Sequence, residues 1–301
     1  MDRGELVHKI SALPLIPWFL TEQAWAGDAR SIFKGRGIEA DEVRHYQSGD
    51  DIRTIDWNVS ARFGTPYVKR YREEREMTVF LVLDCSASMH CRSGPMSRYE
   101  AGLLSAALIA LSAERSGQRV GALFFDQTVT HLFSPRKGRA QVMTMILKAL
   151  SMQAPKGGSD LGAALSRLGR ILKQRTLVVV ISDFLSPPWE RELKNLCHAH
   201  EVMALLIQDP LERDMTDLGL ITLEDPETGL AYQSPVSFPG FQAAWAAWHE
   251  QRYRAFQKTC QSSGAACLTL STAEDGRAKL LRFLRSRPFS RGRKPRNPWS
   301  G

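Results

Sequence analysis

Three apolar runs set the pattern of this chain. Each run is bounded by polar residues and is rich in valine, leucine and isoleucine; the runs cover residues 79–83, 176–181 and 202–207. Runs of this kind are typical of strands buried on both faces of a parallel sheet. The segments between them carry apolar residues at helical spacing, so strands and helices alternate. The alternation predicts an α/β fold with a doubly wound, mostly parallel sheet.

Shorter patterns complete the predicted sheet and its helical layers. Ser97 and Glu100 have the spacing of a capping box at the start of the first long helix. The predicted helices cover residues 97–115, 139–151, 159–173, 189–200, 241–260 and 278–284. The further predicted strands cover residues 119–125 and 128–133 as a hairpin-like pair, 221–223 and 230–232 as a small hairpin, and 267–270 as an edge strand.

Polar side chains follow directly where the first apolar run ends. Asp84, Ser86 and Ser88 alternate along the chain at a spacing of two residues. In open α/β sheets, ligands bind beyond the carboxyl ends of the strands. One carboxylate and two hydroxyls in such a loop can turn three oxygens toward one point, and oxygens are the ligands that Mg²⁺ prefers. A metal site at this strand end is therefore our first hypothesis.

Further oxygens occur at two other predicted element ends. Ser159 precedes a predicted helix, where it or Asp160 can act as the helix cap, and Asp183 follows the second apolar run. Ordinary caps and loop residues are the alternative interpretation of the same pattern. The predicted ligands, which come from three separate loops, are Asp84, Ser86, Ser88, Ser159 and Asp183. We expect Mg²⁺, although Mn²⁺ and Ca²⁺ accept the same ligands.

Charge is concentrated at the C-terminus. The 301 residues include 40 basic and 32 acidic side chains, and seven of the basic ones lie beyond residue 281, where no acidic residue occurs. The rest of the chain is nearly neutral. We expect residues 286–301 to be a disordered tail. Such a tail can bind an anionic partner by counterion release, but no nucleic-acid motif accompanies it, and a solvated end is the more ordinary interpretation.

Other sequence features narrow the function class. The five cysteines show no paired metal spacing, and no apolar run approaches the length of a membrane span, so we expect a cytoplasmic protein. Nucleotide-binding and hydrolase motifs are missing, and we therefore expect a protein without enzymatic activity. The alternative is a Mg²⁺-dependent hydrolase, for which Asp160 is the nearest base in the sequence.

A long motif precedes the first strand. Its letters R-x-Y-x-x-G-D-D-x-R-x-I-D-W-x-x-x-A-R run from Arg44 to Arg62, and the D-x-S-x-S motif follows at residue 84. Together they resemble domain-of-unknown-function family fifty-eight, bacterial proteins with a von Willebrand factor A-like domain. The resemblance covers roughly residues 35–235. It also makes the predicted ligands similar to a metal-ion-dependent adhesion site (MIDAS), with Ser159 where threonine is usual.

The resemblance implies an organisation and a partner. We expect an N-terminal helical and charged segment over residues 1–75 that packs on the main domain, a von Willebrand factor A-like domain over 76–285, and the basic tail. Relatives resemble adaptors of MoxR-type AAA+ ATPases. The resemblance thus implies a metal-dependent protein-binding adaptor whose partner supplies an acidic ligand to the metal, in chaperone-like assembly or remodelling.

Overall fold

The computed structural model describes most of the chain between residues 42 and 286. Within that span it leaves out residues 48–50, 53–54, 71–76, 95, 156, 187, 213–214 and 216–218. The helix predicted within residues 1–30 and the basic tail beyond residue 286 lie outside the described residues.

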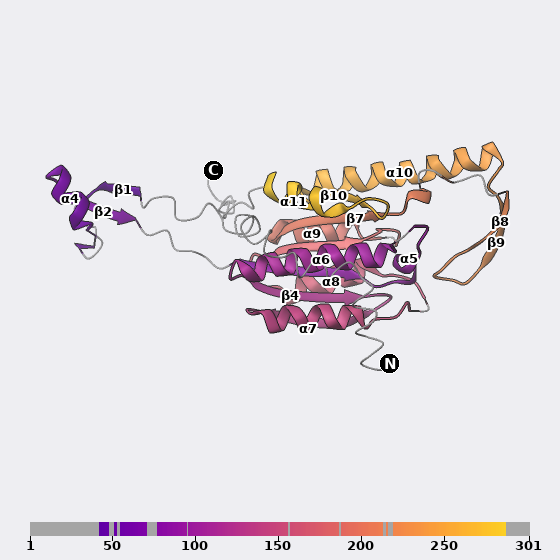
Figure 1. The fold of residues 1–301 in the computed structure, drawn as a ribbon, viewed down its shortest axis with the longest axis horizontal. Helices are drawn as coiled ribbons and strands as arrows, with labels where there is room; N and C mark the ends of the chain where they lie inside the picture. The colour runs from indigo at the N-terminus through magenta and orange to yellow at the C-terminus, as the bar shows by residue number, and fades with distance from the viewer. Residues whose placement is uncertain are drawn as a thin grey trace, which may run out of the picture.

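A six-stranded sheet forms the centre of the fold (Figure 1). Its strands follow the order β10-β7-β6-β3-β4-β5, and all neighbours are parallel except the edge pair of β4 and β5. The strands are β3 (Thr78–Asp84), β4 (Arg119–Phe125), β5 (Val129–Arg136), β6 (Leu177–Ser182), β7 (Glu201–Gln208) and β10 (Ala266–Ser271). The predicted fold class, a doubly wound and mostly parallel α/β sheet, is confirmed.

The strand order reverses between β3 and β6. From β3 the chain moves outward to β4 and β5, then returns to the other side of β3 to build β6, β7 and β10. β3 and β6 pair in register, with Leu83 opposite Ile181. The residues that follow these two positions therefore leave the sheet at the same level. Such a switch point is where open α/β sheets bind their ligands.

Helices cover both faces of the sheet, because the apolar side chains of β3 point alternately to one face and the other and must be buried on both. Val79, Leu81 and Leu83 contribute to a core under one face, whereas Phe80 and Val82 point into the other. The first face is covered by α6 (Arg98–Arg115), α7 (Arg139–Leu150) and α11 (Gly276–Ser286). The second is covered by α8 (Leu161–Ile171), α9 (Glu190–Ala199) and α10 (Pro239–Ser263). Every helix predicted in this part of the chain is present.

Local chemistry fixes several helix ends. The predicted capping box is formed: the Ser97 backbone N–H donates to Glu100 Oε2 at 2.7 Å, and the Glu100 N–H donates to Ser97 Oγ at 3.1 Å. α10 is longer than predicted and ends at Gly264, whose φ of 77° is a left-handed C-cap. The short helices were not predicted. Among them, α5 (Ala87–His90) turns the polar segment after β3 into a single helical turn.

Two small antiparallel pairs lie outside the central sheet. β1 (Glu42–His45) pairs with β2 (Tyr67–Arg70), and α4 (Trp57–Phe63) lies between them in sequence. Asp56 caps α4 by accepting hydrogen bonds from the N–H groups of residues 58 and 59, which accounts for one acidic residue of the long motif. β8 (Leu220–Glu224) pairs with β9 (Ala231–Pro235) and confirms the small predicted hairpin.

Across the part of the chain that the structure describes, the helices are too short or too polar for any of them to cross a bilayer.

The burial of two leucines predicts that their replacement by alanine lowers the free energy of unfolding by very different amounts. Leu165 on α8 is fully buried, whereas Leu147 on α7 is 40% exposed. We expect Leu165→Ala to lower the free energy of unfolding by about 2–5 kcal/mol, because the cavity it leaves is enclosed. The matched control, Leu147→Ala, should change the free energy of unfolding by about 0.5 kcal/mol or less. Urea denaturation of both variants measures the difference, and equal losses would contradict the assigned core.

Candidate metal centre

Asp84 is the last residue of β3 and lies almost entirely out of contact with water, at 1% exposure. Its Oδ1 accepts a hydrogen bond from the Ser86 N–H at 2.9 Å. Its Oδ2 accepts from two hydroxyls, Ser182 Oγ at 2.7 Å and Ser159 Oγ at 3.2 Å. Both carboxylate oxygens therefore face the loops at the carboxyl edge of the sheet, and three polar groups orient them.

The two serines after β3 converge on the same point. Ser86 is the N-cap residue of α5, and Ser88 lies inside this short helix; both are buried. Their Oγ atoms are 3.1 Å apart and share a hydrogen bond. Adjacent ligands of an octahedral Mg²⁺ with bonds of about 2.1 Å are separated by about 3 Å. The separation of the two hydroxyls thus suits a hydrogen bond in the free protein and a pair of cation ligands equally well.

Asp183 follows β6 and completes the predicted set. It is 3% exposed, and its Oδ1 accepts from the Leu185 N–H at 3.1 Å. Its Oδ2 is buried and has no hydrogen-bond partner among the described residues. A carboxylate oxygen in that condition carries a large desolvation penalty, unless a cation or a water compensates it.

Asp84 and Asp183 form a buried acidic pair that the surrounding residues compensate only in part. Burial, with the charge of Asp183 as the next cause, raises the pKa of Asp84 to about 7. Burial also raises the pKa of Asp183, against the opposing effects of the Arg98 charge and of hydrogen bonding with Ser88. Among the described residues, no cationic side chain makes an ion pair with either carboxylate. Two carboxylates this close and this dry disfavour each other's ionised form.

The residues present fit a hard divalent cation. Two carboxylates and three hydroxyls offer oxygen ligands only, which suits Mg²⁺ and its relatives. Within the described ranges, no three histidine, cysteine, aspartate or glutamate side chains gather as a metal cluster. A cation here would therefore depend on the serine hydroxyls and on water, and would keep positions open to an external ligand.

Asp160 has a structural role in this region. Its Oδ1 accepts a hydrogen bond from the Ala163 N–H at 2.7 Å, and it is the N-cap residue of α8. Of the two candidate caps predicted from the sequence, Asp160 is the cap, and Ser159 turns its hydroxyl toward Asp84 instead. The nearest candidate base for a hydrolase in the sequence thus uses its Oδ1 to hold a helix end.

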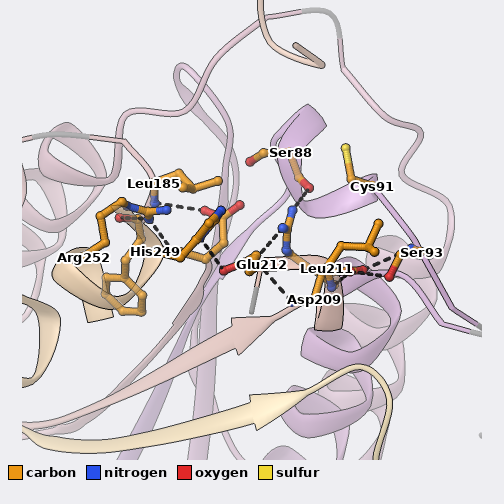
Figure 2. Close-up of polar contacts among 12 residues, drawn as sticks. Ser88, Cys91, Ser93, Leu185, Asp209, Leu211, Glu212, His249 and Arg252 are labelled. Atoms are coloured by element: carbon orange, nitrogen blue, oxygen red, sulfur yellow. Dashed lines mark hydrogen bonds and ion pairs between the residues drawn. The ribbon is translucent and has the colours of Figure 1, made fainter. Parts of the chain in front are cut away.

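A second polar network lies beside these ligands and holds α5 (Figure 2). Arg98, at the start of α6, donates from Nη1 to the backbone oxygen of Ser88 at 3.0 Å and pairs through Nη2 with Glu212. Glu212 also contacts His249 Nδ1 at 3.4 Å and accepts from the Asp209 N–H at 3.2 Å. Despite its burial, the hydrogen bond with His249 and the charge of Arg98 bring the pKa of Glu212 down to about 2.

A cavity of about 280 Å³ opens next to Asp183, between the loop after β6 and α10. Arg252 lines it, donates to the backbone oxygen of Phe184 at 3.3 Å, and stacks over the Trp248 ring at 4.7 Å. Trp248 is 50% exposed. The cavity therefore combines an apolar wall with a fixed positive charge a short way from the acidic pair.

Several residues of this region were missed by the sequence analysis. Ser182 ends an apolar strand, so its hydroxyl could have been counted with the other strand-end oxygens. No sequence pattern indicated the network of Arg98, Glu212 and His249. Arg98 and Glu212 are 114 positions apart and meet only in the folded chain.

The chain is similar in sequence to known proteins. The family described as "Protein of unknown function DUF58" matches residues 42–249. An uncharacterized protein of Mycobacterium bovis is 33% identical over 264 residues, which is 87% of this chain and 83% of the relative. An uncharacterized protein of Mycobacterium avium is 36% identical over 158 residues, covering 50% of this chain and 91% of the relative.

The fold is similar to solved structures at low sequence identity. BatB from Bacteroides thetaiotaomicron aligns with a TM-score of 0.47 and 14% identity, over 70% of this chain and 98% of that one. The SpRpn10 VWA domain aligns with a TM-score of 0.38 and 11% identity, over 72% of this chain and 98% of that one.

The network around Arg98 predicts that mutations of Arg98 and Glu212 have non-additive effects on stability. We expect Arg98→Met to lower the free energy of unfolding by about 3–5 kcal/mol, because Glu212 is then buried without its charge partner. Arg98→Met with Glu212→Leu should lose less than the sum of the two single variants. Denaturant titration of this cycle measures the coupling.

The exposed pair of Arg175 and Glu201 provides a matched control for that cycle. Arg175→Met should change the free energy of unfolding by about 1 kcal/mol at most. If Arg98→Met lowered the free energy of unfolding no more than Arg175→Met does, the buried network would contribute no more to stability than the exposed ion pair.

Proposed function

This chain belongs to the DUF58 family of proteins of unknown function, and from that premise we propose that it is a cation-dependent protein-binding module. Asp84, Ser86, Ser88, Ser159 and Asp183 would hold a divalent cation, with Mg²⁺ as the first candidate. When bound, the cation supplies a Lewis-acidic position that accepts a carboxylate. An aspartate or glutamate of a protein partner is the ligand that we assign to that position.

One observation carries the proposal: the buried Oδ2 of Asp183 has no hydrogen-bond partner among the described residues, and the neighbouring carboxyl of Asp84 has a pKa that burial and the charge of Asp183 raise to about 7. A cation bound by both carboxylates would offset the cost of burying them at the ligand-binding edge of the sheet. The serine hydroxyls around Asp84 are neutral, so they orient the carboxylates without neutralising them. This arrangement supports cation binding without supplying a general base or a phosphate cradle.

For the partner class we propose a MoxR-type AAA+ ATPase, on family resemblance alone. In that role the chain would act as an adaptor without catalytic activity, in assembly or remodelling of other proteins. We also propose the cytoplasm as its compartment, since none of its five cysteines, all within the described residues, forms a disulfide.

Metal binding is the first prediction of this proposal. At a Mg²⁺ concentration of about 100 times Kd, binding should stabilise the fold by about 2.7 kcal/mol, which raises Tm by about 5–10 °C for a domain of this size. We expect Asp84→Ala to lose that rise, because it removes one of the two charges that attract the cation. Calorimetry and thermal unfolding of the full chain, with Mg²⁺ or with EDTA, measure both effects.

A carboxylate at the opposite edge of the sheet provides the control. Glu201 begins β7 and is remote from the carboxyl ends of the strands, so Glu201→Gln should respond to Mg²⁺ as the wild type does.

Partner binding is then tested with a MoxR-type ATPase of the source organism. Wild-type affinity of Asp84→Ala for that ATPase in EDTA would refute the cation-bridged mode of binding.

A further inference from the structure

The cavity next to Asp183 is lined by side chains that one face of α10 brings together. His249, Arg252 and Phe256 follow one another at intervals of three and four residues, which places them on the same face of the helix. All three line the cavity, and Figure 2 shows how His249 and Arg252 lie. The helix α10 therefore supplies a polar, a charged and an apolar group to a single space of about 280 Å³.

Aromatic rings form the apolar wall of this cavity. Phe184 packs against Trp189 with ring centroids 5.0 Å apart, and against Phe256 at 4.8 Å. All three rings are buried and line the cavity. Phe184 adopts a left-handed φ of 52°, which is costly for a bulky residue and persists only where the surrounding packing holds it. The wall is thus a well-packed apolar surface of the kind that binds a bulky side chain.

Arg252 brings a cation without an acidic partner to this wall. Its Nη2 donates to the backbone oxygens of Asp183 at 3.5 Å and of Phe184 at 3.3 Å, and its guanidinium lies over the Trp248 ring. Among the described residues it makes no ion pair, and neither Nε nor Nη1 makes a hydrogen bond. A guanidinium held in this way has N–H groups left to bind a carboxylate.

Three acidic residues also line the cavity, but none of them forms an ion pair with Arg252 in the part of the chain that the structure describes. Glu212 is already paired with Arg98. Asp183 and Glu190 each accept a hydrogen bond from a backbone N–H at 3.1 Å. The cationic side of the cavity is therefore left to an acidic group of a ligand.

His249 adds a hydrogen-bonding atom to the same space. Its Nδ1 lies 3.4 Å from Glu212, and its Nε2 is buried without a hydrogen-bond partner among the described residues. Because the pKa of Glu212 is about 2, this carboxylate is ionised and favours the ring hydrogen on Nδ1. In that neutral ring Nε2 is an acceptor, and leaving it unpaired costs free energy. An N–H group of a ligand would satisfy it.

We propose that the cavity binds the C-terminal residue of a protein partner, and that this residue has a bulky apolar side chain. Small-ligand sites measure about 300–1,000 Å³, so a space of about 280 Å³ holds one residue and not a longer segment. Only at its C-terminus does a chain carry an apolar side chain and a carboxylate on one residue. The side chain packs on the aromatic wall, the α-carboxylate binds Arg252, and the N–H donates to His249 Nε2.

The inference takes from the proposed function only that the ligand is a protein, and it needs no bound cation. The test therefore uses the full chain in EDTA, with N-acetyl-phenylalanine as the probe. The indole N–H signal of Trp248 reports binding by NMR, because this ring lies under Arg252, and the signal is identified by its loss in Trp248→Phe.

We expect N-acetyl-phenylalanine to bind the wild type about 10- to 100-fold more tightly than N-acetyl-phenylalanine amide, which lacks the carboxylate. N-acetyl-aspartyl-phenylalanine amide carries its carboxylate on a side chain and should bind as weakly as the amide. If it bound as tightly as N-acetyl-phenylalanine, an acidic side chain would be the occupant and the proposal would be wrong. No saturable shift of the Trp248 signal would overturn the site altogether.

A pair of arginines on α10 supplies matched variants. Arg252→Met should bind N-acetyl-phenylalanine and its amide equally weakly. Arg254 is exposed on the same helix and pairs with Glu250, so Arg254→Met should keep the wild-type preference. A preference that survives in Arg252→Met would contradict the assigned contact. Failure of Mg²⁺ to stabilise the wild type would refute the cation site and leave these titrations, made in EDTA, unchanged.

Discussion

Repulsion between two buried carboxylates is the constraint around which this fold is arranged. Asp84 ends β3, and Asp183 follows the neighbouring strand β6. The parallel register that sets Leu83 opposite Ile181 brings both strand ends to the same edge of the sheet, where Ser182 donates to Asp84 Oδ2 and Asp183 follows one residue later. Hydroxyl groups orient Asp84 but carry no charge. The folded chain therefore keeps two buried acidic groups at its ligand-binding edge, where burial disfavours their ionised forms.

The neighbouring network of Arg98, Glu212 and His249 shows how a buried carboxylate behaves in the same protein when it has charged and hydrogen-bonding partners. There, hydrogen bonding and a paired cation bring the pKa of Glu212 down to about 2, whereas the pKa of Asp84 rises to about 7. The two carboxylates are buried to a similar degree, so the difference comes from their partners. Because Arg98 also binds the Ser88 backbone, the compensated network holds the loop that presents the hydroxyls, while the acidic pair remains available to a ligand.

Sequence patterns predicted most of the fold because its elements follow simple periodicities. The apolar runs that became β3, β6 and β7 are buried along nearly their whole length, and such strands are recognisable without any tertiary information. The oxygens that end β3 and follow β6 could be predicted for the same reason, since parallel strands bring their carboxyl ends together. The network of Arg98, Glu212 and His249 could not be predicted. Arg98 and Glu212 are 114 positions apart, and no local pattern encodes their contact.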